Sequence, residues 1–115
     1  TYFLQWRDQL RKEGISVPLV AGILPPASWK AIKYMSDMCG VSIPNDLAQD
    51  LKKNVNNPEV SRQIGFDHVE RQIEELLSEE VDGVHLYALN HSETVKRLGS
   101  KLKDASRKSI KSLAN

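Results

Sequence analysis

Two apolar runs constrain the fold more than any other feature of this chain. The first extends from Val17 to Leu24, and the second from Gly83 to Asn90, with His85 and Tyr87 embedded in it. Each run is followed by apolar residues at helical spacing, an alternation typical of parallel α/β proteins. We therefore expect two parallel strands, Val17–Leu24 and Val84–Leu89, covered by helices on both faces. The chemistry of such proteins lies where the strands end.

Helical patterns flank the first run. Phe3, Trp6 and Leu10 recur at helical spacing, and Gly14 supplies the left-handed residue that ends a helix. After the first run, Ser28 is expected to cap a second helix that ends at Gly40. The buried stripe predicted for this second helix consists of Trp29, Ile32, Met35 and Cys39 or Met38.

A longer helical region separates the two runs. A short helix after Pro44 carries Leu47 and Leu51, and Asn57-Pro58 is expected to begin the next helix as cap and first residue. The apolar stripe predicted for that helix consists of Phe66, Val69, Ile73, Leu76 and Leu77. Gly65, inside the same helix, indicates a close approach by another segment.

The C-terminal region is expected to be helical and basic. Asn90 or Ser92 can cap a helix through Leu98, with a pause at Gly99. Residues 100–115 read as a basic C-terminal helix or tail, most simply a solvated face. No repeat or linker divides the chain, so residues 1–115 are expected to form a single segment.

Composition excludes several classes of protein. The net charge of +1 gives no field to attract nucleic acid, and no apolar run approaches the ~20 residues of a spanning helix. We expect a cytoplasmic protein that binds neither nucleic acid nor membrane. Cys39 is the one cysteine and cannot form an internal disulfide. No His, Cys, Asp or Glu pattern has the spacing of a metal site.

Two strands cannot close a sheet. Each would leave one edge without hydrogen-bond partners, so we expect either more strands from the same polypeptide or another chain to cover these edges. A homo-oligomer is expected on the same ground.

An ordered set of motifs resembles the C-terminal part of the catalytic domain of the methylenetetrahydrofolate reductase family. The motifs are Ala21-Gly22-Ile23-Leu24-Pro25, Trp29-Lys30, Val41-Ser42-Ile43-Pro44, Gly65 and Gly83 to Asn90. The family reads roughly Pro-Gly-Ile-Leu/Phe-Pro at the first motif and His-Phe-Tyr-Thr-Leu-Asn-Arg at the last. The resemblance extends over residues 1–99.

The resemblance implies a flavin-containing (βα)8 TIM barrel, in which this chain supplies the sixth helix, seventh strand, seventh helical connection, eighth strand and eighth helix. The implied reaction passes a hydride from NAD(P)H to FAD and then to 5,10-methylenetetrahydrofolate, a step of one-carbon metabolism and methionine biosynthesis. The family's catalytic glutamate and FAD-binding residues correspond to earlier strands. We therefore expect no catalytic or cofactor-binding residue in this chain, and neither bound cofactor nor activity for the chain alone.

The resemblance also implies four positions that face the folate substrate. Tyr87 matches the tyrosine of the last motif. His91 stands where bacterial members have arginine, Ala31 where they have glutamine, and Met35 where they have phenylalanine. These three departures bear on substrate affinity and identity.

Other interpretations of these residues stay open. His85 shares a strand face with Tyr87, and it is either a buried structural histidine or a functional one. His68 is expected to be solvated. The alternative function is a non-catalytic α/β module whose exposed apolar faces dimerise or dock on a partner chain.

Overall fold

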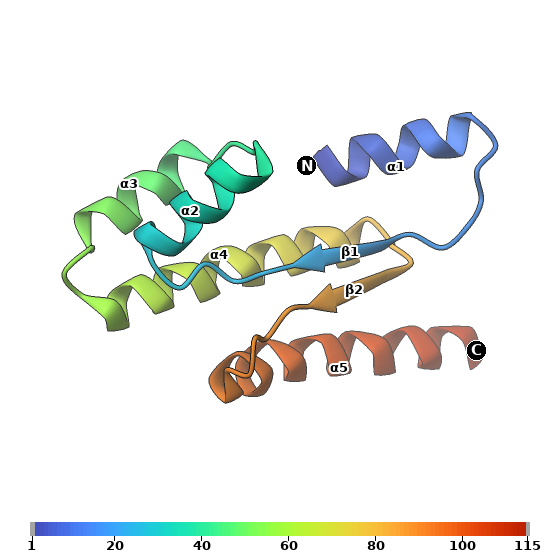
Figure 1. Cartoon of the computed structure of the whole chain (residues 1–115). Helices are drawn as coiled ribbons and strands as arrows, with labels where there is room; N and C mark the ends of the chain where they lie inside the picture. The colour runs from blue at the N-terminus through green and yellow to red at the C-terminus, as the bar shows by residue number, and fades with distance from the viewer. Residues whose placement is uncertain (1, 115) are drawn as a thin grey trace. The chain divides into compact units, whose positions relative to one another are not determined.

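The computed structural model describes residues 2–114, and the side chains of residues 2–106. Its elements in chain order are α1 (Tyr2–Lys12), β1 (Val20–Ile23), α2 (Trp29–Cys39), α3 (Asn45–Lys53), α4 (Pro58–Ser78), β2 (Gly83–Leu86) and α5 (Ser92–Ala114) (Figure 1). They form two compact units. Unit 1 joins the residues up to Ile23 with those from Gln72 onward, and unit 2 is Leu24–Arg71, so that α4 belongs to both.

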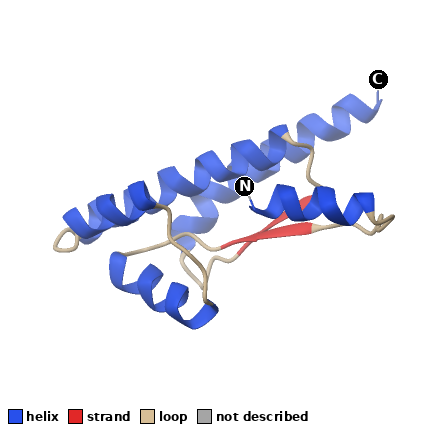
Figure 2. Cartoon of the chain, turned by 90° about the horizontal axis from the view of Figure 1, so that it is seen from above, coloured by secondary structure: helices blue, strands red, loops and turns tan. Residues whose placement is uncertain are grey.

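The sheet of unit 1 consists of β1 and β2, which lie side by side in parallel (Figure 2). Gly22 pairs with His85 and Ile23 with Leu86. One more bond, from Tyr87 N to Ile23 O at 2.9 Å, continues the pairing beyond β2. The prediction of two parallel strands is therefore confirmed, although both are shorter than expected. Pro18 lies before β1, where its missing N–H breaks no pairing.

The two faces of this sheet differ in burial. Ala21 and Ile23 are buried, whereas Val20 is 57% exposed and Gly22 is also exposed. Side chains alternate along a strand, so a helical layer on one side buries only every second residue. The prediction that both faces are covered is wrong for the described residues. One face of the sheet remains open to solvent, and it is the face that carries His85.

The predicted end of α1, both predicted ends of α2 and the predicted start of α4 are confirmed. Ser28 Oγ accepts the N–H of Ala31 at 3.1 Å, and Gly40 ends α2 in the left-handed region. Gly14, after α1, also has a positive φ of 79°. Asn57 Oδ1 accepts a backbone N–H of the first turn of α4 at 3.2 Å, and Pro58 is the first helical residue.

Helix α4 supplies much of the buried apolar surface. Four predicted stripe residues are buried, namely Phe66, Val69, Ile73 and Leu76. Leu77 is 37% exposed, so its predicted burial is wrong; it lies at the edge of the stripe in the last turn. Gly65 is buried, and a Cβ built on it would overlap the carbonyl oxygen of Pro26, which confirms the predicted close approach.

Helix α2 does not bury its predicted stripe. Trp29 and Ile32 are half-buried, whereas Met35, Met38 and Cys39 are exposed. The spacing of apolar residues correctly indicated one face of the helix, but in unit 2 that face is only partly covered. Helix α3 contacts α2, and the ammonium of Lys52 on α3 lies 4.5 Å from the centre of the Trp29 ring.

Helix α5 runs beside β2 and continues through Gly99 without a break, so the predicted pause is wrong (Figure 1). A single glycine costs a helix about 1 kcal/mol, too little to end one this long. The basic segment 100–115 is helical as far as Ala114; its side chains from residue 107 on lie outside the described residues. Among the described helices, none combines the length and apolar composition required to cross a membrane.

Candidate functional site

The ring of Tyr87 lies at the C-terminal end of the two strands, on the open face of the sheet. It extends from β2 toward β1, because a Cβ built on Gly22 would lie 2.8 Å from its Cε2 atom and 3.2 Å from its hydroxyl oxygen. The His85 ring is its second neighbour, with ring centres 4.5 Å apart and planes tilted by 58°. Tyr87 is 49% exposed, so about half of the residue stays available to a ligand.

His85 and Tyr87 share one face, as the two-residue period of a strand predicted. His85 is exposed, so the interpretation of it as a buried structural histidine is wrong. The group that comes closest to Gly22 is the side chain of Tyr87.

A strained turn leads from Tyr87 into α5. Leu89 and Asn90 both have positive φ, 47° and 63°, and the N–H of His91 donates to Ala88 O at 2.9 Å. The carbonyl oxygen of His91 accepts from Val95 N at 3.4 Å. His91 is therefore the capping residue that precedes the helix, so the predicted caps Asn90 and Ser92 are both wrong. The side chain of His91 is exposed.

The two remaining predicted substrate residues lie in unit 2. Ala31 and Met35 are one helical turn apart on α2, so they share a face of that helix, and both are exposed. Tyr87 and His91 belong to unit 1. The structure thus places the predicted residues in two pairs, one in each unit.

Comparison with known proteins identifies the family. The sequence model of the methylenetetrahydrofolate reductase family matches residues 1–103. The chain belongs to the methylenetetrahydrofolate reductase family. The resemblance carried by the sequence motifs is therefore confirmed.

Individual members of the family match at moderate identity. The 5,10-methylenetetrahydrofolate reductase of Escherichia coli is 32% identical over 91 residues, which are 79% of this chain and 31% of that protein. Methylenetetrahydrofolate reductase (NADH) 1 of Arabidopsis thaliana is 30% identical over 88 residues, or 76% of this chain and 15% of that protein. Methylenetetrahydrofolate reductase 1 of Schizosaccharomyces pombe is 26% identical over 100 residues, 87% of this chain and 17% of that protein. The chain thus spans a third or less of the length of these relatives.

A second polar cluster of this reductase-family chain lies at the opposite, N-terminal end of the strands. Asp82 Oδ2 accepts from Arg11 Nη2 and from Leu19 N, each at 2.8 Å. Arg11 Nη1 also donates to the carbonyl oxygens of Ile15 at 2.7 Å and Val17 at 3.0 Å. This Arg11–Asp82 clamp holds the residues that precede β1 and β2. Asp82 was not singled out from the sequence, although an aspartate directly before a strand was a signal for such a cap.

His68 is half-buried in unit 2, so the prediction of a solvated histidine is wrong. Burial away from water lowers the pKa of His68 below 6.5, and the nearby positive charge of Arg71 lowers it further, whereas Asp46 acts in the opposite direction. The neutral form of His68 is therefore favoured in the folded chain. This histidine lies on α4 in unit 2.

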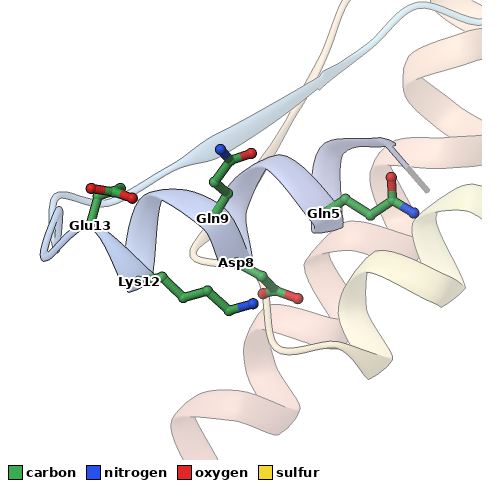
Figure 3. A pocket seen from close by; sticks show the side chains of 5 residues that line it. All are labelled: Gln5, Asp8, Gln9, Lys12 and Glu13. Carbon is green, nitrogen blue, oxygen red and sulfur yellow. The ribbon is translucent and has the colours of Figure 1, made fainter.

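Other hollows and clusters offer little chemistry. A depression along α1 is lined by Gln5, Asp8, Gln9, Lys12 and Glu13 (Figure 3). Four of these side chains come from α1 and the fifth, Glu13, from the turn directly after it, and none belongs to a family motif. In the part of the chain that the structure describes, no three His, Cys, Asp or Glu side chains gather as a metal site would require. The C-terminal end of the strands is therefore the candidate site.

Proposed function

We propose that the protein to which this chain belongs reduces 5,10-methylenetetrahydrofolate to 5-methyltetrahydrofolate, with NAD(P)H as hydride donor and FAD as carrier. Family membership supports the reaction class. The observation that carries the role of this segment is the half-exposed Tyr87 ring beside His85 at the C-terminal end of parallel strands, where α/β enzymes bind their substrates. This chain contributes to the folate side of the site.

The residues present fit a folate better than a flavin. A flat aromatic ring can stack on the exposed part of Tyr87, and its hydroxyl can orient a polar group of the pterin or benzoyl portion. The space above Gly22, where the backbone of β1 lacks a side chain, is occupied by Tyr87 and leaves no cradle for a cofactor. FAD, when bound, supplies the hydride chemistry of the reaction. We assign no residue of this chain to FAD.

Three positions modify how the folate is held. His91 offers one or two N–H donors where arginine would offer a bidentate fork, so we expect a weaker grip on a folate carboxylate. Ala31 has no side-chain hydrogen bond to offer, and Met35 offers a flexible apolar surface instead of an aromatic ring. These side chains are all exposed in their own units, which leaves them available to a substrate.

The proposed architecture is part of a (βα)8 barrel. In the described sheet, β1 and β2 pair with each other alone, which leaves one edge of each strand for further strands. The open face that carries Val20, Gly22 and Tyr87 suits the interior of a closed barrel. We propose that the missing strands belong to the same polypeptide, that the protein is cytoplasmic, and that it forms a homo-oligomer.

The test compares the chain of 115 residues with the intact protein. The intact protein should carry a flavin absorption spectrum and form 5-methyltetrahydrofolate from NAD(P)H and 5,10-methylenetetrahydrofolate. The chain alone should be colourless and inactive. An intact protein with flavin but no turnover of this folate would refute the proposed substrate, and NAD(P)H oxidation by the chain alone would refute its dependence on the remaining segments.

A second candidate function is an interaction module without catalysis. It is favoured by large apolar side chains on the surface of the described structure, among them Trp6 at 51%, Tyr34 at 63% and Met38 at 61% exposure. A module of this kind would have a solution mass at a small multiple of 13.0 kDa and no flavin. A yellow protein of much larger mass in the same preparation would exclude it.

A further inference from the structure

Gly22 and Tyr87 make the closest approach on the open face of the sheet. A Cβ on Gly22 would lie 2.8, 3.2 and 3.4 Å from Cε2, the hydroxyl oxygen and Cζ of Tyr87. Real Cβ atoms do not reach the first distance, so the ring can occupy this place only because residue 22 has no side chain. The three atoms are at the far end of the ring, so a methyl group at residue 22 would move the ring rather than the backbone.

Two further contacts fix the other sides of Tyr87. Its backbone N–H donates to Ile23 O at 2.9 Å, which anchors the start of the side chain to β1. His85, the residue paired with Gly22, holds its ring 4.5 Å from the Tyr87 ring. Gly22 and His85 thus lie beside the ring, while Tyr87 as a whole remains 49% exposed.

We infer that Gly22 is a positioning residue, which sets where the Tyr87 ring lies and thereby where a folate ring can stack. The identity of the substrate in this inference rests on the proposed function, whereas the position of the ring rests on the geometry alone. Gly22 itself touches no reacting group in this account. It acts through Tyr87.

The backbone at residue 22 does not require glycine. Positive φ values occur at Gly14 and Gly40, whereas Gly22 lies in the extended region that any residue adopts. A matched control is available in Gly83 on the neighbouring strand. A Cβ there would lie 3.4 and 3.8 Å from the methyl groups of Val20, which is ordinary contact. Gly22→Ala and Gly83→Ala thus make the same chemical change in paired strands, and only the first collides with the ring.

The first experiment measures the ring and needs no folate. NMR spectra of the intact protein with labelled tyrosine and histidine rings should show displaced Tyr87 and His85 resonances in Gly22→Ala, but near-unchanged ones in Gly83→Ala. Unchanged Tyr87 resonances in Gly22→Ala, or equal changes in both variants, would overturn the positioning role whether or not the protein binds folate.

The second experiment measures substrate binding. In the intact protein, Gly22→Ala should weaken methylenetetrahydrofolate binding, by up to about a hundredfold for a ring displaced by about 1 Å, while flavin reduction by NAD(P)H keeps its rate. Added to Tyr87→Ala, the same substitution should change binding by less than about twofold, because the ring that it displaces is gone. An equal loss with and without the ring would overturn the inference. A wild-type protein that binds no folate would refute the proposed function, and the ring resonances would then decide the positioning role alone.

Discussion

The two ends of the β1–β2 pair are held by different means. At the N-terminal end, Arg11 and Asp82 join through a charged hydrogen bond, and Asp82 also holds Leu19 N. At the C-terminal end, the Tyr87 ring lies against Gly22, and two residues of positive φ, Leu89 and Asn90, lead into α5. At the N-terminal end Arg11 and Asp82 hydrogen-bond to each other and to the backbone, whereas the C-terminal end leaves Tyr87 about half exposed. In parallel α/β proteins, this division separates stability from substrate binding.

The largest effect is expected at the clamp. Asp82→Ala removes the acceptor of both Arg11 and Leu19 N, and we expect it to lower the free energy of unfolding by about 1–2 kcal/mol. Urea denaturation measures this loss. Asp82→Asn is the control, because it keeps an oxygen for Leu19 N, and it should cost roughly half as much.

The same variant tests whether the two ends are separate. In the intact protein, Asp82→Ala should leave the methylenetetrahydrofolate KM within about twofold of wild type, since distant sites act independently. A KM raised together with the loss of stability would show that the two ends of the strand pair do not act separately.

A smaller effect of opposite sign is expected at the other end. Leu89 is 67% exposed and has a φ of 47°, a conformation that costs a non-glycine residue about 1–2 kcal/mol. Leu89→Gly should therefore raise the free energy of unfolding by about 0.5–1 kcal/mol after the entropic cost of glycine. Leu89→Ala keeps the strain and should give no such gain. Equal stabilities for the two variants would mean that this turn stores no strain.

The smallest expected effect is a pH dependence of stability, which arises at His68 and at neither end of the strand pair. Because the pKa of His68 is lowered in the folded chain, the unfolded chain binds this proton more readily, and stability should fall as the pH drops below 6.5. Thermal unfolding between pH 7 and pH 5 measures the slope. His68→Gln should flatten it, and Asp82→Ala should keep it. A slope that is identical in wild type and His68→Gln would contradict the assignment to this residue.

The helix caps at Ser28 and Asn57 and the close approach at Gly65 could be predicted from the sequence, whereas the covering of a helix or strand face by another layer could not. The caps at Ser28 and Asn57 depend on neighbouring residues, and a glycine inside a helical pattern, as at Gly65, indicates that another segment packs closely there, so all three could be predicted. A spacing pattern tells which residues share a face but not whether another layer covers it. For that reason the burial of Met35 and of Val20 was predicted wrongly.

The candidate site likewise has features that could be predicted from the sequence and features that could not. The shared face of His85 and Tyr87 follows from the period of a strand, and the family motif singled out Tyr87. The contact between Gly22 and Tyr87 depends on the register of two strands about sixty residues apart in the chain, and no local pattern specifies that register. The clamp of Arg11 on Asp82 depends on the same long-range pairing.

The role of Tyr87 is tested most directly by the two half-reactions of the Tyr87→Phe variant of the intact protein. This change removes only the hydroxyl, so reoxidation of the reduced flavin by 5,10-methylenetetrahydrofolate should slow by about tenfold, as expected for one lost hydrogen bond. Reduction of the flavin by NAD(P)H should keep its wild-type rate in the same stopped-flow experiment. Equal losses in both half-reactions, or none in either, would contradict a folate contact at the C-terminal end of the strands.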